Sequence, residues 1–300
     1  MRRSYPLAKR LLHLIEAAGL LALIVLVWPL STDWASSLGG WCARRIGPWL
    51  PVSRVGRDNL RRAYPEKSAA EIEAILAGVW ENLGRYLLEY PHLERIWDVD
   101  EQGRSRRIEM PDAAEFIRLR ESGKPAIIFG AHLANWELLA VAPARHGLEV
   151  TVLFRPPNNP IAATILQRIR NAAMGELLSI GVHTAIGATA VLDRGGKLGM
   201  LVDQHVRLGP QVMFFGQPVR VSAMLAKLAR RYGCAVHGAR VERLDGARFR
   251  VRLTPPLELP PPLEDPAADA AAIMSLVTAT VEGWVREHPE QWLWLHRRWR

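Results

Sequence analysis

The 300-residue sequence contains only two cysteines and lacks the short motifs of several large enzyme classes. Cys42 and Cys234 lie far apart, which argues against a disulfide framework and against a structural zinc site. No G-x-S-x-G, H-E-x-x-H, G-x-x-x-x-G-K-[ST] or G-x-G-x-x-G pattern occurs. The sequence therefore does not support a serine hydrolase, a zinc protease, a P-loop enzyme or a dinucleotide-binding enzyme. We expect no bound metal and no cofactor.

The composition is basic and moderately apolar. Hydrophobic residues make up 49% of the chain and charged residues 23%, which is typical of a globular protein with a buried core. The formal net charge of +9 predicts attraction to an anionic partner, such as a lipid surface, an acidic carrier protein or a nucleic acid. The basic residues are scattered and no nucleic-acid-binding motif is present, so we expect no nucleic-acid partner.

One long apolar run is present, close to the N-terminus. Residues 11–30 read LLHLIEAAGLLALIVLVWPL and are interrupted only by His13 and Glu16. The run has the ~20 residues that a bilayer-spanning helix needs. A cleaved signal peptide and a buried helix are the alternatives, but no small-residue cleavage site follows directly. We predict a membrane anchor over residues 1–34 and one further domain over residues 35–300. Basic residues flank both sides, so the orientation of the anchor stays open.

The rest of the chain alternates between strand-like and helix-like segments. Ser68 and Glu71 have the spacing of a capping box before a helix. Predicted strands cover 126–129, 148–154, 198–202, 235–241 and 248–253, and predicted helices cover 133–145, 160–178, 223–232 and 269–286. This alternation predicts an α/β fold, with a mixed β-sheet sandwiched by helices.

His132 and Glu137 directly follow the first of these strands. Strand ends that lead into helices are where α/β folds place their ligand chemistry. Five residues of ideal helix turn roughly 500°, which leaves the two side chains ~140° apart. They meet only if His132 lies in the turn before the helix and Glu137 reaches back to it. Such a pair would activate a hydroxyl group. A helix-capping histidine beside a surface glutamate is the alternative.

The segment GAHLANWE resembles the H-x4-D/E motif of the glycerolipid acyltransferase superfamily. Its asparagine, tryptophan and glutamate narrow the resemblance to the late acyltransferases of lipid A biosynthesis, the lauroyl/myristoyl type. Further stretches match this branch in the same order: NLRRAYPEKS, GVWENLGRYLLE, FRPPNNP, GMLVDQH, FFGQPVRVSAMLAKLARRYGCAV and HPEQWLWLHRRWR. The resemblance covers nearly the whole chain, although the segment at 206–218 is shorter than in enterobacterial members.

The resemblance implies transfer of a fatty acyl chain from an acyl carrier protein thioester to a hydroxyl of a lipid A precursor. It places the enzyme at the bacterial inner membrane, and we expect the catalytic domain at the cytoplasmic face. His132 is then the general base and Glu137 its orienting partner. Arg155, in FRPPNNP, would stabilise the oxyanion or bind an acceptor phosphate; a solvent-facing arginine is the alternative.

Four more residues are candidates for substrate binding. Asn135 lies within the H-x4-E segment, and Asp203 and Gln204 end a predicted strand, where they would support the site, bind the acceptor or simply form a turn. Arg168 lies two residues from Arg170, so the two point to different faces of their helix. One of them would contact the carrier or a phosphate, unless both are solvated. The C-terminal segment HRRWR is expected to contact the membrane surface or the carrier.

Several alternatives stay open at this point. The acceptor could be another glycolipid, such as a phosphatidylinositol mannoside, and the donor could be a coenzyme A thioester. A membrane-anchored basic protein that binds lipid or nucleic acid without catalysis is supported by charge alone. A hydrolase that uses the same histidine on water is a third reading.

Overall fold

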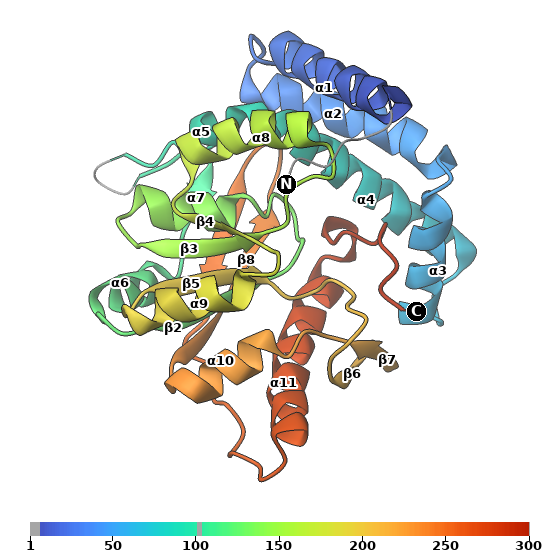
Figure 1. The fold of residues 1–300 in the computed structure, drawn as a ribbon. Coiled ribbons are helices and arrows are strands. Elements are labelled where there is room, and N and C mark those ends of the chain that lie inside the picture. Colours follow the sequence, from blue (N-terminus) through green and yellow to red (C-terminus); the bar gives the residue numbers. More distant parts are fainter. Residues whose placement is uncertain (1–6, 101–103, 300) are drawn as a thin grey trace.

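A seven-stranded sheet lies at the centre of the fold, which the computed structural model describes for residues 7–100 and 104–299 (Figure 1). Its strand order is β1-β9-β8-β2-β5-β3-β4. Only β8 and β9 pair antiparallel within it, so the predicted mixed sheet is confirmed. The strands are β1 (Ile108–Glu109), β2 (Ala126–Gly130), β3 (Val150–Phe154), β4 (Leu177–Ser179), β5 (Lys197–Leu201), β8 (Ala235–Arg243) and β9 (Phe249–Leu253), and a separate hairpin joins β6 (Gln211–Phe214) to β7 (Gln217–Arg220).

Helices cover both faces of the sheet, as expected (Figure 1). A side chain at Gly130 of β2 would meet Leu139 of α7, whereas the neighbouring Phe129 stacks on Trp284 of α11. Because successive strand residues point to opposite faces, α7 and α11 lie on opposite sides. The helices are α1 (Leu7–Val27), α2 (Thr32–Ile46), α3 (Ser53–Ala63), α4 (Ala69–Glu89), α5 (Leu93–Ile96), α6 (Ala113–Glu121), α7 (Leu138–Arg145), α8 (Pro160–Ala173), α9 (Thr184–Asp193), α10 (Met224–Tyr232) and α11 (Pro266–Glu287), with short 3-10 helices η1 (Gly47–Trp49), η2 (Tyr90–His92) and η3 (Pro289–Gln291).

The central strand β2 positions the loop that carries His132. Its sequence AIIFG is almost entirely buried, as is usual for a strand with neighbours on both sides and helices on both faces. β2 pairs in parallel with β5, with Gly130 opposite Leu201. The loops that leave these two strands therefore start side by side at the same edge of the sheet. This register brings His132 and Asp203 together.

Helix α4 supports the sheet from the N-terminal half of the chain. The predicted capping box is confirmed, because Ser68 and Glu71 bond each other's backbone N–H groups. Helix α2 packs closely on α4, where Gly39 and Gly84 face each other. A Cβ atom at Gly39 would lie 2.2 Å from the Gly84 carbonyl oxygen. Only glycine allows so close an approach of the two backbones.

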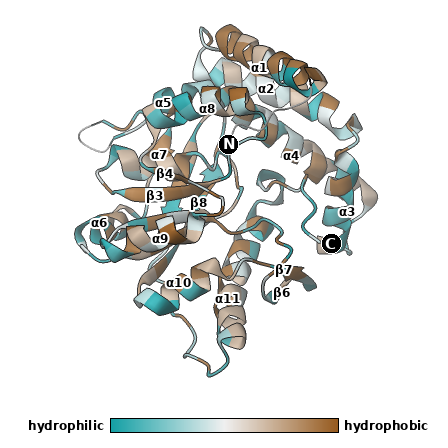
Figure 2. Ribbon diagram, in the orientation of Figure 1, coloured by the Kyte–Doolittle hydropathy of each residue, from teal (hydrophilic) through white to brown (hydrophobic). Residues whose placement is uncertain are grey.

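Helix α1 is long and apolar enough to cross a membrane, by length and composition (Figure 2). Only 17% of its most apolar window is buried within the protein, which does not fit the core helix of a soluble protein. The helix contacts α8. There the Asn159 side chain donates hydrogen bonds to the His13 carbonyl and the Glu16 carboxylate.

Two predicted helix boundaries were wrong. Helix α8 ends at Ala173 rather than at 178, because Met174 takes an extended conformation and 177–179 join the sheet as β4. Helix α7 begins at Leu138 rather than at 133. Residues 131–137 form an irregular loop, in which Ala134 has a left-handed φ of 49°.

Candidate active site

The loop after β2 is held by the C-terminal segment of the chain. Leu133 forms an isolated bridge with Trp292, and the Leu293 N–H donates to the His132 carbonyl at 3.1 Å. The Ala134 N–H donates to the Gln291 carbonyl at 2.9 Å. These backbone contacts hold Ala134 in its left-handed conformation and anchor the loop to the C-terminal segment. His132 therefore lies in the turn before α7, the position that pairing with a carboxylate was expected to require.

His132 is paired with Asp203 from the loop after β5. The Nδ1 of His132 lies 2.8 Å from one carboxylate oxygen of Asp203, and the His132 backbone N–H donates to the other oxygen at 2.8 Å. The Trp292 indole N–H donates to that second oxygen as well, also at 2.8 Å. Because an ionised carboxylate only accepts hydrogen bonds, Nδ1 carries the proton and the lone pair of Nε2 is available.

The charges of this pair are coupled. Burial disfavours the imidazolium form of His132, but the charge and hydrogen bond of Asp203 outweigh burial and raise the pKa of His132 above its usual value. Burial would raise the pKa of the Asp203 carboxyl, yet His132 holds it well below its usual range. The ring of nearby His296 lies 6.5 Å from that of His132, and burial lowers the pKa of His296.

The expected pairing of His132 with Glu137 is wrong. Glu137 instead forms a buried ion pair with Arg170 of α8 at 2.6 Å, and the Tyr86 hydroxyl donates to it at 3.1 Å. Glu137 is the N-cap residue of α7, and its side chain reaches Arg170 of α8, while Asp203 occupies the Nδ1 side of the imidazole. The Glu137 charge still contributes to the raised pKa of His132, and both residues line the same cavity.

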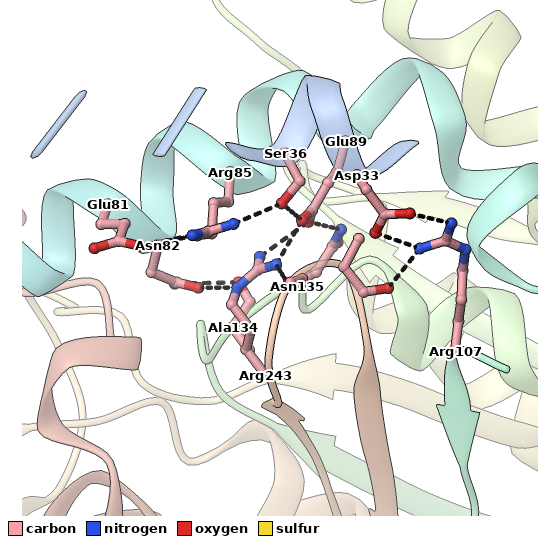
Figure 3. Close-up of polar contacts among 12 residues, drawn as sticks. Asp33, Ser36, Glu81, Asn82, Arg85, Glu89, Arg107, Ala134, Asn135 and Arg243 are labelled. Carbon is pink, nitrogen blue, oxygen red and sulfur yellow. Dashed lines mark hydrogen bonds and ion pairs between the residues drawn. The ribbon is translucent and has the colours of Figure 1, made fainter. Parts of the chain in front are cut away.

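A buried polar network supports the other side of the loop (Figure 3). Glu89 of α4 is fully buried and accepts hydrogen bonds from Ser36, Asn135 and Arg243. Asn82 of α4 bonds the Arg243 side chain at 2.9 Å and the Gln291 carbonyl at 3.1 Å. The network joins α2, α4, the His132 loop and β8. These hydrogen bonds connect the four elements, although the Oδ1 of Asn135 is buried without a partner among the described residues.

An apolar cavity of about 550 Å³ extends from His132 into the protein. It follows the α7 face of the sheet, past Ile128 and Gly199, to Val150 at the amino end of β3. Its remaining walls are largely aliphatic. A largely aliphatic space with a histidine in its wall is suited to a hydrocarbon chain whose reacting end lies at that histidine.

The structure brings some of the other predicted residues to this cavity. Arg155 and Gln204 line it, and the Gln204 amide nitrogen lies 3.4 Å from Nε2 of His132. Asn135 is fully buried in the Glu89 network and does not line the cavity, and Arg168 is exposed on α8 outside it. Arg168 and Arg170 do point to different faces of α8, as predicted.

Sequence reasoning missed several residues of the site. Asp203 was expected to support the site, bind the acceptor or form a turn, but its direct hydrogen bond to His132 was not predicted. The C-terminal segment HRRWR was expected to contact the membrane surface or the carrier, but Arg298 and Trp299 within it are buried, as are the preceding Trp292 and Trp294. Their sequence signal was present in the density of tryptophans, which gain most by burial. Within residues 7–100 and 104–299, no group of three or more His, Cys, Asp and Glu side chains could hold a metal ion.

Comparisons with known proteins place the chain in a family. Residues 6–300 match the family described as bacterial lipid A biosynthesis acyltransferase. A lipid A biosynthesis palmitoleoyltransferase of Escherichia coli K12 is 27% identical over 253 residues, which cover 81% of this chain and 77% of that protein. A phosphatidylinositol mannoside acyltransferase of Mycobacterium tuberculosis H37Rv is 24% identical over 291 residues, which cover 90% of this chain and 89% of that protein. The match over almost the whole length, together with the histidine site at the end of an apolar cavity, shows that this chain is an acyltransferase of the bacterial lipid A biosynthesis acyltransferase family.

Proposed function

We propose that this protein transfers a fatty acyl chain from an acyl carrier protein thioester to a hydroxyl of a lipid A precursor, with His132 as general base. The observation that carries this proposal is the His132–Asp203 pair at the end of the apolar cavity. The acyl chain would occupy the cavity and present its thioester carbonyl beside Nε2 of His132.

The reaction follows from this arrangement. Nε2 of His132 takes the proton of the acceptor hydroxyl while the hydroxyl oxygen attacks the thioester carbonyl carbon. Asp203 stabilises the imidazolium that forms. The tetrahedral intermediate then collapses, the carbon–sulfur bond breaks, and the thiolate receives the proton from the imidazolium. One ester forms and one thiol is released, without a covalent acyl-enzyme.

Arg155 is proposed to stabilise the oxyanion of the intermediate. It directly follows β3 and lines the cavity together with His132. A guanidinium held where negative charge develops lowers the barrier more than it stabilises the neutral carbonyl. Glu137 is proposed to act through its charge on His132 and through Arg170, which it holds in the cavity wall.

The N-terminal part is proposed to bind the cytoplasmic face of the inner membrane. Residues 1–34 would form the anchor and residues 35–300 the catalytic domain. Beyond α1, three exposed tryptophans support membrane contact: Trp34, Trp41 and Trp49 are 75%, 57% and 86% exposed. Arg45 lies over the ring of Trp41 at 4.8 Å. Tryptophan next to arginine is typical of the membrane–water interface.

A phosphatidylinositol mannoside is a second candidate acceptor, because one relative of this chain is named for acylating it. The mycobacterial relative acylates a phosphatidylinositol mannoside by name, and it matches a larger part of this chain than the E. coli relative does. Its identity of 24% is slightly lower. A non-lipid A glycolipid is therefore the alternative acceptor for the same reaction.

An assay with the purified full-length protein tests the proposal. The donor is lauroyl- or myristoyl-acyl carrier protein, and the acceptors are a tetra-acylated lipid A precursor and a phosphatidylinositol mannoside. We expect ester formation on the lipid A precursor by wild type and none by His132→Ala. Transfer only to the phosphatidylinositol mannoside would show that the acceptor is the alternative glycolipid rather than the lipid A precursor. Release of free fatty acid without transfer to either lipid would contradict the proposal and indicate a hydrolase.

A further inference from the structure

A second cavity, also of about 550 Å³, lies on the other side of His132. It shares His132, Arg155, Gln204 and His205 with the apolar cavity. Because the two spaces meet at His132, a molecule in the second one lies next to the carbonyl of a chain bound in the first. The second space is therefore where an acceptor hydroxyl would approach.

The second cavity is basic rather than apolar. Arg155, Arg207 and Arg297 all line it, and no aspartate or glutamate does so among the described residues. None of the three forms an ion pair with an acidic residue in the described part of the chain, whereas Arg170 and Arg243 each bind a buried carboxylate. Like charges that share one cleft repel each other. An anionic ligand would remove this cost.

One further polar group of the second cavity, on His296, lacks a hydrogen-bond partner among the described residues. This group is the Nε2 of the imidazole, which is buried. Guanidinium groups match the geometry of phosphate and bind it through two parallel hydrogen bonds. A phosphate group held by the arginines of this cavity would neutralise their unpaired charge.

We propose that Arg207 and Arg297 bind a phosphate group of the acceptor lipid and so position the acceptor hydroxyl at His132. This inference rests on the proposed function, because it needs an acyl acceptor at that histidine. The donor also carries a phosphate, but the whole length of the pantetheine arm separates that phosphate from the thioester. A phosphate beside His132 therefore belongs to the acceptor. Arg155 lines both cavities, next to the reacting carbonyl, so the test uses the other two arginines.

The test compares two acceptors that differ only in phosphate. These are a tetra-acylated glucosamine disaccharide with its phosphates and the same lipid after the phosphates are removed. We expect wild type to show a KM about tenfold or more higher for the phosphate-free lipid, in line with loss of charge-assisted hydrogen bonds. Arg207→Gln and Arg297→Gln are each expected to raise the KM for the phosphorylated lipid about tenfold, with a small change in kcat. Neither variant should change the KM for the phosphate-free lipid.

Arg231→Gln is the matched control, because Arg231 is exposed on α10 and lines neither cavity. It should leave all of these constants unchanged. A second arm uses acyl-pantetheine and acyl-phosphopantetheine as donors with the phosphate-free acceptor. Equal KM values of wild type for the two acceptors, or a loss in the variants that follows the donor phosphate, would overturn the inference while transfer itself remains. If wild type acylates neither lipid, the proposed function fails and this inference fails with it.

Discussion

Asp203 bonds both the imidazole Nδ1 and the backbone N–H of His132, each at 2.8 Å. The two bonds involve different oxygens of one buried carboxylate, so they fix both the tautomer and the plane of the ring. The Trp292 indole fixes the carboxylate in turn. Nε2 is thereby held toward the cavities, in the form that accepts a proton.

The first prediction concerns Asp203→Asn and pH. Asp203 raises the pKa of His132, and the reaction needs the neutral imidazole, so wild-type kcat/KM should rise with pH through a pKa above the usual value of about 6.5. Asp203→Asn removes the charge that favours the imidazolium. The rising limb should therefore move to lower pH, while the maximal rate falls because the imidazolium loses its partner. A pH–rate profile of both proteins measures this, and an unshifted limb would contradict the role of Asp203.

The second prediction concerns the buried ion pair between Glu137 and Arg170. Removing one partner leaves the other charge buried and unpaired, so Glu137→Gln should lower the free energy of unfolding by about 3 kcal/mol or more. Arg44→Gln, which breaks the more exposed pair with Glu81, should cost less than about 1 kcal/mol. Denaturant unfolding of both variants in detergent provides the comparison. Equal losses would show that the buried pair is not a special element of stability.

The third prediction concerns the length of the acyl chain. Val150, the first residue of β3, lines the apolar cavity at the edge of the sheet opposite to the carboxyl end of β2, which His132 follows. A larger side chain there would fill the end of the space that the methyl end of the acyl chain is expected to occupy. Val150→Phe should therefore move the preference to shorter donors, measured as kcat/KM over a series of acyl-carrier-protein chain lengths. Its kcat with short donors should stay near wild type; an equal loss with every donor would instead indicate disturbed packing.

The fourth prediction concerns membrane binding by the exposed tryptophans. A protein that lacks residues 1–31 should still bind anionic vesicles, because Trp34, Trp41 and Trp49 remain exposed. Replacing all three with serine in this truncated protein should reduce the bound fraction in a vesicle sedimentation assay by about tenfold or more. A triple replacement that leaves binding unchanged would assign the attachment to other residues.

Much of the fold follows from local patterns. The capping box before α4, the buried run of β2 and the alternation in β9 are each read within a few residues, and all three elements are confirmed. The end of α8 was predicted wrongly because a short apolar run such as 177–179 fits a helix and an edge strand equally well. Sheet pairing with β3, a tertiary interaction, decides between the two.

The site was less accessible to sequence reasoning, for a physical reason. His132 and its turn follow from the end of β2, but the partner of His132 depends on which loop lies next to it. The pairing of β2 with β5 decides which loop that is. The two residues that meet there, His132 and Asp203, are 71 residues apart in the sequence. Glu137 is close in sequence, yet its position at the start of α7 directs it to Arg170. Proximity in the sequence therefore did not predict which carboxylate binds the Nδ1 of His132.

The most direct test of the account is mass spectrometry of lipid A from cells that lack their own late acyltransferases. These cells express either wild type or His132→Ala, with equal membrane content of both proteins checked by immunoblot. The account predicts one added acyl chain with wild type and none with His132→Ala, since loss of a general base costs at least ~10²- to 10⁴-fold in rate. An added chain with both proteins would contradict the role of His132 and with it the mechanism.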